Sequence, residues 1–169
     1  MITLVLGGTR SGKSTLAESW MPKGGLYIAT AEILDAEMKA RIDSHVTRRG
    51  TNWQTLEAPL DLAQALHLHD RPALVDCLTL WVSNLLLAGR DATREVEDVI
   101  AALKARRADT ILVSNEVGLG IVPDNALARD FRDGAGIVNQ KIAAMADRVV
   151  FVAAGLPLVL KGALSEKFP

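Results

Sequence analysis

A short apolar run followed by a glycine-rich loop opens the chain and limits what it can fold into. Residues 7–14 read Gly-Gly-Thr-Arg-Ser-Gly-Lys-Ser, the G-x-x-x-x-G-K-S pattern of the phosphate-binding loop (P-loop). A strand-like run, residues 2–6, precedes this loop, and a helix-like run, residues 15–20, follows it. In this context backbone N–H groups can surround phosphate oxygens. The alternative, a chance match on a glycine-rich turn, is disfavoured by these flanking segments.

The P-loop pattern predicts a role for each of its residues. Lys13 would reach the β and γ phosphates of a nucleotide, and Ser14 would hold Mg²⁺. The N-terminus of the following helix adds a favourable dipole. The expected phosphate-contacting residues are Gly7, Gly8, Thr9, Arg10, Ser11, Gly12, Lys13 and Ser14. The chain is therefore expected to bind a nucleoside triphosphate.

Short apolar strands alternate with longer helical segments along the rest of the chain. The expected strands are residues 26–29, 53–57, 73–75 and 110–113, with a final hairpin formed by 148–153 and 156–160. The expected helices are residues 34–49, 60–68, 78–87, 93–107 and 125–145. Strands that are apolar throughout indicate a parallel sheet covered on both faces. We expect one α/β domain over residues 1–169, a P-loop NTPase fold with a doubly wound, mostly parallel sheet and its site at the strands' carboxyl ends.

Composition argues against several classes of protein. The net charge of −1 gives no electrostatic case for a nucleic-acid partner. The apolar run over residues 149–160 is interrupted by Gly155 and Pro157 and is too short to span a bilayer. Cys77 is the one cysteine, so no intrachain disulfide can form, and the first strand begins without a signal-like segment. We expect a cytoplasmic enzyme without a membrane segment.

Two acidic residues at strand ends are candidates for the chemistry. Asp76 ends an apolar strand, the position of the acidic residue that supports Mg²⁺ in P-loop enzymes, although it could instead cap the helix that begins near Thr79. Glu116 follows another strand and would face the γ phosphate as a base, water-orienting group or metal support. For Glu116 the alternative is a loop carboxylate that binds nearby amides. The P-loop upstream favours the metal role for Asp76, whereas both roles of Glu116 stay open.

His45 lies within the expected helix 34–49 but outside its apolar stripe. Arg41 is four residues before it, and Arg48 and Arg49 are three and four residues after it, so all three share its surface. Guanidinium groups bind phosphate well, and neighbouring cations favour the neutral, nucleophilic imidazole. Spacing alone, however, favours a solvated basic face near a helix C-terminus.

Ten segments resemble, in order, the family of bifunctional adenosylcobinamide kinase/adenosylcobinamide-phosphate guanylyltransferase of cobalamin biosynthesis. The matching segments are residues 7–14, 27–31, 35–38, 41–45, 53–57, 75–81, 83–86, 114–123, 129–133 and 136–140. They extend the resemblance to about Lys161, beyond which we assign no function. The R-I-x-x-H element of residues 41–45 and the N-E-V-G-x-G-I-V-P element of residues 115–123 make it specific.

The resemblance implies two reactions. ATP or GTP phosphorylates the aminopropanol hydroxyl of adenosylcobinamide. GTP then guanylylates a histidine, releasing pyrophosphate, and the GMP passes to adenosylcobinamide phosphate to give adenosylcobinamide-GDP. That histidine falls on His45, and imidazole suits the role because it is both a nucleophile and a leaving group.

The resemblance also implies binding residues and an assembly. The implied nucleotide contacts are residues 7–14, Thr30, Ala31, Glu32, Arg48, Arg49, Glu57 and Asp76. A homotrimer is implied as well. With the residues chosen above, the expected catalytic groups are His45, Lys13 and Glu116, and the expected metal-supporting groups are Ser14 and Asp76.

Two rival functions remain at this point. A plain small-molecule kinase would need Lys13, Ser14 and Asp76 but not His45. A GTP-dependent switch is weaker, because the sequence contains no N-K-x-D element for guanine recognition.

Overall fold

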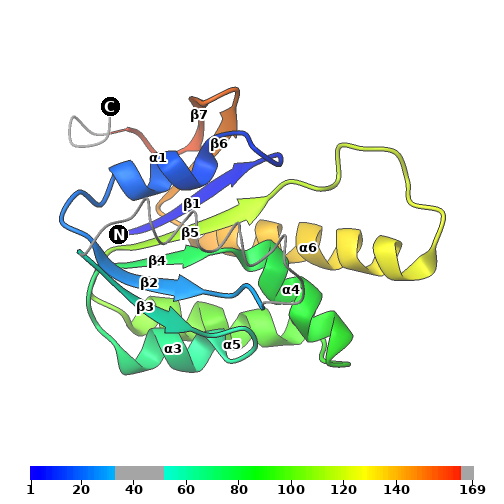
Figure 1. Ribbon diagram of the computed structural model, residues 1–169, viewed down its shortest axis with the longest axis horizontal. Coiled ribbons are helices and arrows are strands. Elements are labelled where there is room, and N and C mark those ends of the chain that lie inside the picture. Colours follow the sequence, from blue (N-terminus) through cyan, green and yellow to red (C-terminus); the bar gives the residue numbers. More distant parts are fainter. Residues whose placement is uncertain (33–51, 165–169) are drawn as a thin grey trace.

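One mixed sheet organises the computed structural model, which describes residues 1–32 and 52–164 (Figure 1). Its strands are β1 (Ile2–Gly7), β2 (Gly25–Ala29), β3 (Trp53–Glu57), β4 (Ala73–Asp76), β5 (Thr110–Asn115), β6 (Arg148–Ala153) and β7 (Leu156–Lys161). Within the described ranges they lie in the order β3-β2-β4-β5-β1-β6-β7. Every neighbouring pair is parallel except β6 and β7, which form an antiparallel hairpin. The expected α/β class, mostly parallel sheet and C-terminal hairpin are confirmed.

Helices cover both faces of this sheet, which explains why its central strands are apolar at consecutive positions. The helices are α1 (Lys13–Ser19), α3 (Leu62–Leu68), α4 (Leu78–Leu87), α5 (Ala92–Ala105) and α6 (Ala126–Met145). Leu4 and Leu6 of β1 pack into a core with α3, α4, α5 and α6, whereas Val5 between them packs into a second core with α1. Among the helices of the described ranges, Figure 1 shows α1 on one side of the sheet and α3, α4, α5 and α6 on the opposite side. Each central strand is therefore buried through both sets of alternating side chains.

Helix boundaries differ from the sequence-based expectation by one or two residues. Helix α5 begins at Ala92 because the Asp91 carboxylate accepts a hydrogen bond from the Thr93 backbone N–H at 2.9 Å, a typical N-cap. It ends at Ala105, since Arg106 is already extended. None of the helices in the described part of the chain is long and apolar enough to cross a membrane.

The strand order decides which loops can form a common site. The carboxyl ends of β1, β5, β4 and β2 all lie at one edge of the sheet, because these strands are parallel. Gly7 at the end of β1 pairs with Asn115 at the end of β5. Strand β5 separates β1 from β4, so Asp76 lies one strand further from the P-loop than a direct neighbour would.

Candidate nucleotide-binding site

The P-loop connects β1 to α1, and two of its residues have left-handed backbone conformations. Arg10 has φ 58° and Gly12 has φ 94°, and the Ser11 backbone N–H donates to the Gly8 carbonyl at 3.2 Å. Gly12 is the N-cap of α1 and makes no side-chain capping bond. The first backbone N–H groups of α1 therefore have no capping partner from the side chain at this position, and they face the edge where the parallel strands end. This is the geometry that a phosphate group requires.

The ammonium group of Lys13 is held against this loop. Its side chain is buried, with 8% exposed, and Nζ donates a hydrogen bond to the Gly8 carbonyl oxygen at 3.0 Å. Burial lowers the pKa of Lys13 below its ordinary value, while the nearby Cys77 and Asp76 raise it again in part. A phosphate beside the ammonium would offset that desolvation. Ser14 follows at the start of α1 and is half-buried.

The turn between β6 and β7 packs directly on the P-loop. The backbone N–H of Gly155 donates to the Ser11 carbonyl at 2.8 Å. A Cβ atom on Gly12 would lie 3.2 Å from the Gly155 Cα, and a Cβ on Gly7 would lie 2.5 Å from the Val152 carbonyl oxygen. The sequence predicted the turn but carried no signal of this contact, since the two segments are about 140 residues apart. The hairpin thus supports the loop that would hold the phosphates.

Gly12→Ala is expected to weaken nucleotide binding roughly 10-fold, equivalent to about 1.4 kcal/mol. The added Cβ meets Gly155, and the left-handed backbone costs a non-glycine residue about 1–2 kcal/mol. Titration with a fluorescent ATP analogue measures the effect. Gly89→Ala is the matched control, because Gly89 has φ 70° with open space around it. Equal affinities of the two variants would contradict the proposed contact.

Asp76 accepts a hydrogen bond that no local pattern in the sequence indicates. The Tyr27 hydroxyl donates to Asp76 Oδ2 at 2.7 Å. Tyr27 is buried, with 3% exposed, and its ring makes an edge-to-face contact with Trp53 at 5.9 Å between centroids. Helix α4 has Cys77 as its N-cap with no side-chain capping bond, so the alternative role of Asp76 as a helix cap is wrong. Tyr27 therefore orients one carboxylate oxygen and leaves the other for a different partner.

The segment after β2 is attached to the end of β4. The buried Thr30 hydroxyl donates to the Cys77 carbonyl at 2.7 Å and accepts from the Cys77 backbone N–H at 2.8 Å. Asn84 of α4 donates to the Thr30 carbonyl at 2.7 Å. Both capacities of the hydroxyl are thus used within the protein. Ala31 and Glu32 follow at half-buried positions, and exposed Glu57 pairs with Ala29 in the register of β3 and β2.

Cys77 is a buried thiol beside these groups. Burial, and then the charge of Asp76, raise the pKa of Cys77 to about 11. The thiol therefore stays protonated near neutral pH and is a packing group at this edge.

Glu116 lies next to the first residue of the P-loop. Its backbone N–H donates to the Gly7 carbonyl at 3.1 Å, and its Oε1 accepts from the Gly118 backbone N–H at 2.6 Å. This second bond is the one expected of a loop carboxylate that binds nearby amides. The Glu116 carboxylate nevertheless remains at the edge that the P-loop occupies.

The comparisons with known proteins agree with this geometry. Residues 3–160 match the family described as cobinamide kinase / cobinamide phosphate guanyltransferase. The chain is 49% identical to the bifunctional adenosylcobalamin biosynthesis protein CobP of Pseudomonas aeruginosa, covering 96% of this chain and 98% of that protein. It belongs to the cobinamide kinase / cobinamide phosphate guanyltransferase family. The resemblance drawn from the sequence motifs is confirmed.

Two further relatives and one solved structure are also similar to this chain. The bifunctional adenosylcobalamin biosynthesis proteins CobU of Escherichia coli and Salmonella typhimurium are 41% and 44% identical to it, each match covering 95% of this chain and 100% of the relative. The crystal structure of the flagellar accessory protein FlaH from Methanocaldococcus jannaschii superposes with a TM-score of 0.52. At 11% identity over 95% of this chain and 78% of FlaH, that likeness concerns the fold alone. Family membership makes the protein a transferase with kinase and guanylyltransferase activities, which removes the regulatory switch as a rival.

Part of the site predicted for this family member lies outside the described residues. His45, Arg41, Arg48 and Arg49 all fall within residues 33–51, so their roles stay predictions. In the ranges 1–32 and 52–164, no group of three or more His, Cys, Asp or Glu side chains is arranged to hold a metal ion. Ser14 and Asp76 are the predicted metal-supporting residues, one hydroxyl and one carboxylate at the same edge of the sheet.

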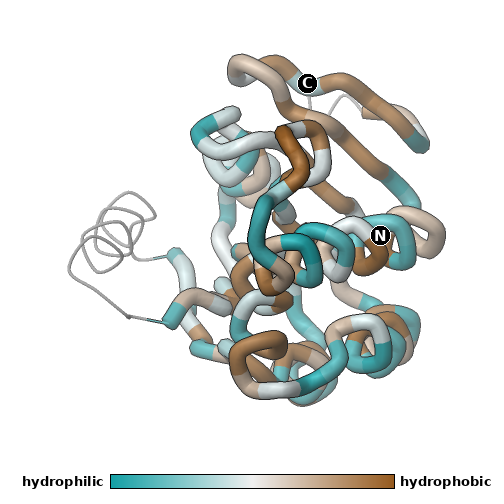
Figure 2. The backbone as a smooth tube through the Cα atoms, turned by 90° about the vertical axis from the view of Figure 1, so that its right-hand side faces the viewer, coloured by the Kyte–Doolittle hydropathy of each residue, from teal (hydrophilic) through white to brown (hydrophobic). Residues whose placement is uncertain are grey.

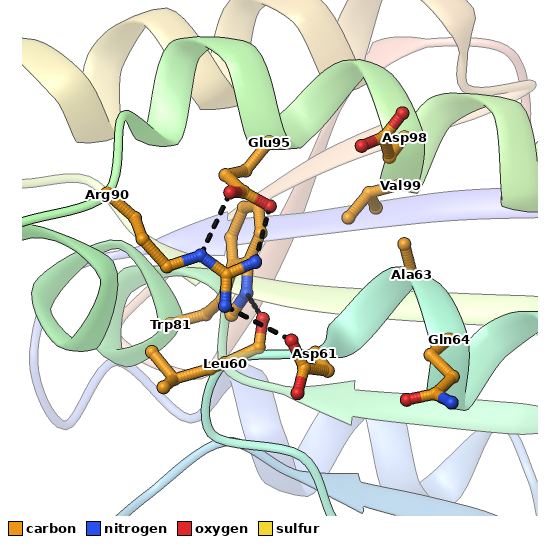
Figure 3. Close-up of a pocket in the computed structure, with 9 residues that line it drawn as sticks. All are labelled: Leu60, Asp61, Ala63, Gln64, Trp81, Arg90, Glu95, Asp98 and Val99. Carbon is orange, nitrogen blue, oxygen red and sulfur yellow. Dashed lines mark hydrogen bonds and ion pairs between the residues drawn. The ribbon is translucent and has the colours of Figure 1, made fainter. Parts of the chain in front are cut away.

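A small cavity lies on the face of the sheet opposite α1 (Figure 3). It is lined by the loop that precedes α3 and by helices α3, α4 and α5. Its volume is about 180 Å³. Arg90 binds both carboxylate oxygens of Glu95 at 2.9 and 2.8 Å and contacts Asp61 at 3.1 Å. The Trp81 indole N–H donates to the Leu60 carbonyl at 2.8 Å. None of the predicted site residues within 1–32 and 52–164 lines this cavity. The ion pairs within it join the N-terminus of α3, α5 and the turn after α4.

Proposed function

We propose that this protein phosphorylates the aminopropanol hydroxyl of adenosylcobinamide and then guanylylates the product through a covalent histidine intermediate. The P-loop with the buried ammonium of Lys13 against it carries the kinase half of the proposal. The family match and the R-I-x-x-H element that ends at His45 support the guanylyltransferase half.

The kinase step is a displacement at the γ phosphorus. The substrate hydroxyl oxygen forms a bond to that phosphorus, the bond to the β-phosphate oxygen breaks, and the nucleoside diphosphate leaves. Lys13 stabilises the negative charge that develops on the phosphoryl oxygens. Glu116 is proposed to accept the hydroxyl proton or to orient the group that does, because it lies beside Gly7.

The guanylyl transfer is two successive displacements at the α phosphorus of GTP. An imidazole nitrogen of His45 forms a bond to that phosphorus, and pyrophosphate leaves. A phosphate oxygen of adenosylcobinamide phosphate then displaces the imidazole and takes the GMP. Arg41, Arg48 and Arg49 are proposed to bind the triphosphate, since guanidinium groups pair well with phosphate oxygens.

One labelling experiment separates this proposal from a plain kinase. The protein is incubated with α-labelled GTP, denatured, and examined for label retained on the chain. Retained label supports the covalent intermediate, whereas kinase activity without retained label would support the plain kinase.

We further propose that Mg²⁺ takes part in both half-reactions. The residues present fit such an ion: Ser14 offers a hydroxyl, and Asp76 keeps one carboxylate oxygen beyond its bond to Tyr27. Phosphate oxygens would complete the coordination, with Asp76 acting through water. When bound, Mg²⁺ would neutralise charge on the phosphates.

Asp76→Asn is expected to raise the Mg²⁺ concentration that gives half-maximal activity. Tyr27→Phe is expected to raise the same concentration roughly 10-fold, because a supporting hydrogen bond to a metal-binding group is lost. Mg²⁺ titrations of both half-reactions measure this effect, and Mn²⁺ binding in the presence of nucleotide provides a readout independent of turnover. Wild-type Mg²⁺ dependence in Asp76→Asn would confine Asp76 to its structural bond with Tyr27.

A homotrimer in the cytoplasm completes the proposal, as the family resemblance implies. Exposed leucines of the C-terminal hairpin, at positions 156, 158 and 160, offer apolar surface for contacts between copies. Figure 2 shows hydrophobic colouring along this hairpin near the C-terminus. Sedimentation analysis of the purified protein tests the trimer.

A further inference from the structure

The proposed acceptor places a requirement on the protein that the P-loop does not meet. In adenosylcobinamide the hydroxyl that receives phosphate is at the end of a flexible aminopropanol arm. The corrin macrocycle, a broad ring system with methyl groups and amide side chains, therefore has to be held away from the γ phosphate. A second surface, apolar and displaced from the P-loop, is needed near the carboxyl edge of the sheet.

The loop between β5 and α6 has this position. It begins at Glu116, whose backbone N–H is bonded to the Gly7 carbonyl at 3.1 Å, so it starts beside the P-loop. Strand β5 is the direct neighbour of β1. Figure 1 shows the loop extending beyond the sheet edge toward which the parallel strands point, before the chain returns into α6. Figure 2 views the molecule from that side.

This loop exposes large apolar side chains that the core does not use. Leu119 is 82% exposed, Ile121 is 96% exposed and Val122 is 62% exposed. Leu127, in the first turn of α6, is 55% exposed. Scattered single residues of this kind are ordinary, but several within nine residues beside a substrate site indicate a binding surface. We refer to Leu119, Ile121, Val122 and Leu127 as the apolar loop patch.

Polar contacts hold the loop in shape at both ends. Glu116 Oε1 accepts from the Gly118 backbone N–H at 2.6 Å. At the other end, Arg129 Nη1 donates to the carbonyl oxygens of Pro123 and Asp124 at 3.0 and 2.8 Å. Asn125 caps α6 by accepting from the Ala128 backbone N–H at 2.8 Å. A surface that is already ordered loses less conformational entropy when a ligand binds.

We propose that the apolar loop patch binds the corrin macrocycle of the acceptor and so directs its aminopropanol arm toward the P-loop. This inference rests on the proposed function for the identity of the acceptor. The loop that carries the patch starts beside Gly7 and extends beyond the edge of the sheet where the parallel strands end. This position selects a corrinoid over a second copy of the chain, because the acceptor must approach this edge for the reaction to occur. A second copy remains an outcome of the test.

The test is a Leu119→Ser, Ile121→Ser double variant. Both side chains are exposed, so the fold does not depend on them. We expect the dissociation constant for adenosylcobinamide, measured by equilibrium dialysis using the corrin absorbance, to rise roughly 10- to 100-fold. The KM for the corrinoid in the kinase reaction should rise equally, while nucleotide affinity and label retained from α-labelled GTP stay unchanged.

Leu68→Ser is the matched control. Leu68 is 65% exposed at the C-terminal end of α3, which leads toward the amino end of β4 and thus to the opposite edge of the sheet. This variant should bind and phosphorylate the corrinoid as the wild type does. An effect of the same size in Leu68→Ser would contradict a localised binding surface.

The outcomes separate this inference from the proposed function. If the wild-type protein binds the corrinoid but does not phosphorylate it, the proposed function fails and the patch is still tested by dialysis. If the double variant binds the corrinoid as tightly as the wild type, the inference is wrong. A change in sedimentation without a change in corrinoid binding would assign the patch to a contact between copies. Absence of corrinoid binding by the wild type would overturn both.

Discussion

His45→Ala is expected to retain no label from α-labelled GTP after denaturation, while it still phosphorylates adenosylcobinamide with ATP. Removing the nucleophile of a covalent mechanism typically costs on the order of 10⁴- to 10⁶-fold in rate. The P-loop residues are unchanged in this variant, so the kinase step keeps its own cation and phosphate contacts. Label retention and the kinase rate are measured on the same preparation.

The chemistry of the adduct provides a second check on the same residue. A phosphoramidate on imidazole is labile in acid and stable in base, so the wild-type label should be lost only in acid. His67→Ala and His69→Ala serve as controls, because these residues lie at the end of α3 and are expected to keep the label. If His45→Ala still forms the adduct, another residue is the nucleophile. Loss of the label in His67→Ala or His69→Ala would then identify that residue.

Lys13→Ala is expected to lower kcat/KM of the kinase reaction by roughly 10²- to 10³-fold or more, the loss found when one group that stabilises transition-state charge is removed. Lys13 is the buried cation whose Nζ lies against the P-loop, so no exposed lysine can replace it. Steady-state kinetics with ATP and adenosylcobinamide measure the effect. Thermal unfolding confirms that the variant is folded.

Lys104→Ala provides the matched control for that experiment. Lys104 is an exposed lysine in the last turn of α5, far from the P-loop in the chain, and its loss removes the same charge. Its kinase rate should equal that of the wild type. A folded Lys13→Ala protein with an intact kinase rate would contradict the assignment of residues 7–14 as the phosphate-binding loop.

Much of the fold could be predicted because its signals are carried by consecutive residues. The P-loop is a strand, a glycine turn and a helix start within about twenty residues, and the structure has these elements at residues 2–7 and 13–19. The strand from Ala73 to Asp76 was recognisable because it is apolar at successive positions, which requires cover on both faces. The hairpin of β6 and β7 was recognisable from Gly155 between two apolar runs.

Which residues meet at the site depended on contacts between segments that are distant in the sequence. Tyr27 reaches Asp76 across 49 positions because β2 and β4 are neighbours in the sheet. Gly155 reaches the P-loop because β6 lies beside β1. Local periodicity predicts neither of these strand pairings, because it is the same for any order of parallel strands.

The sequence by itself thus determined the family, the phosphate-binding motif and the class of sheet, since these follow from local patterns and ordered motifs. Tertiary structure alone decided that β5 separates β1 from β4, and that the loop carrying Glu116 and the apolar loop patch starts beside Gly7. The physical reason is that strand order results from how the covering helices and both cores pack together. That packing is a property of the whole chain rather than of any one segment.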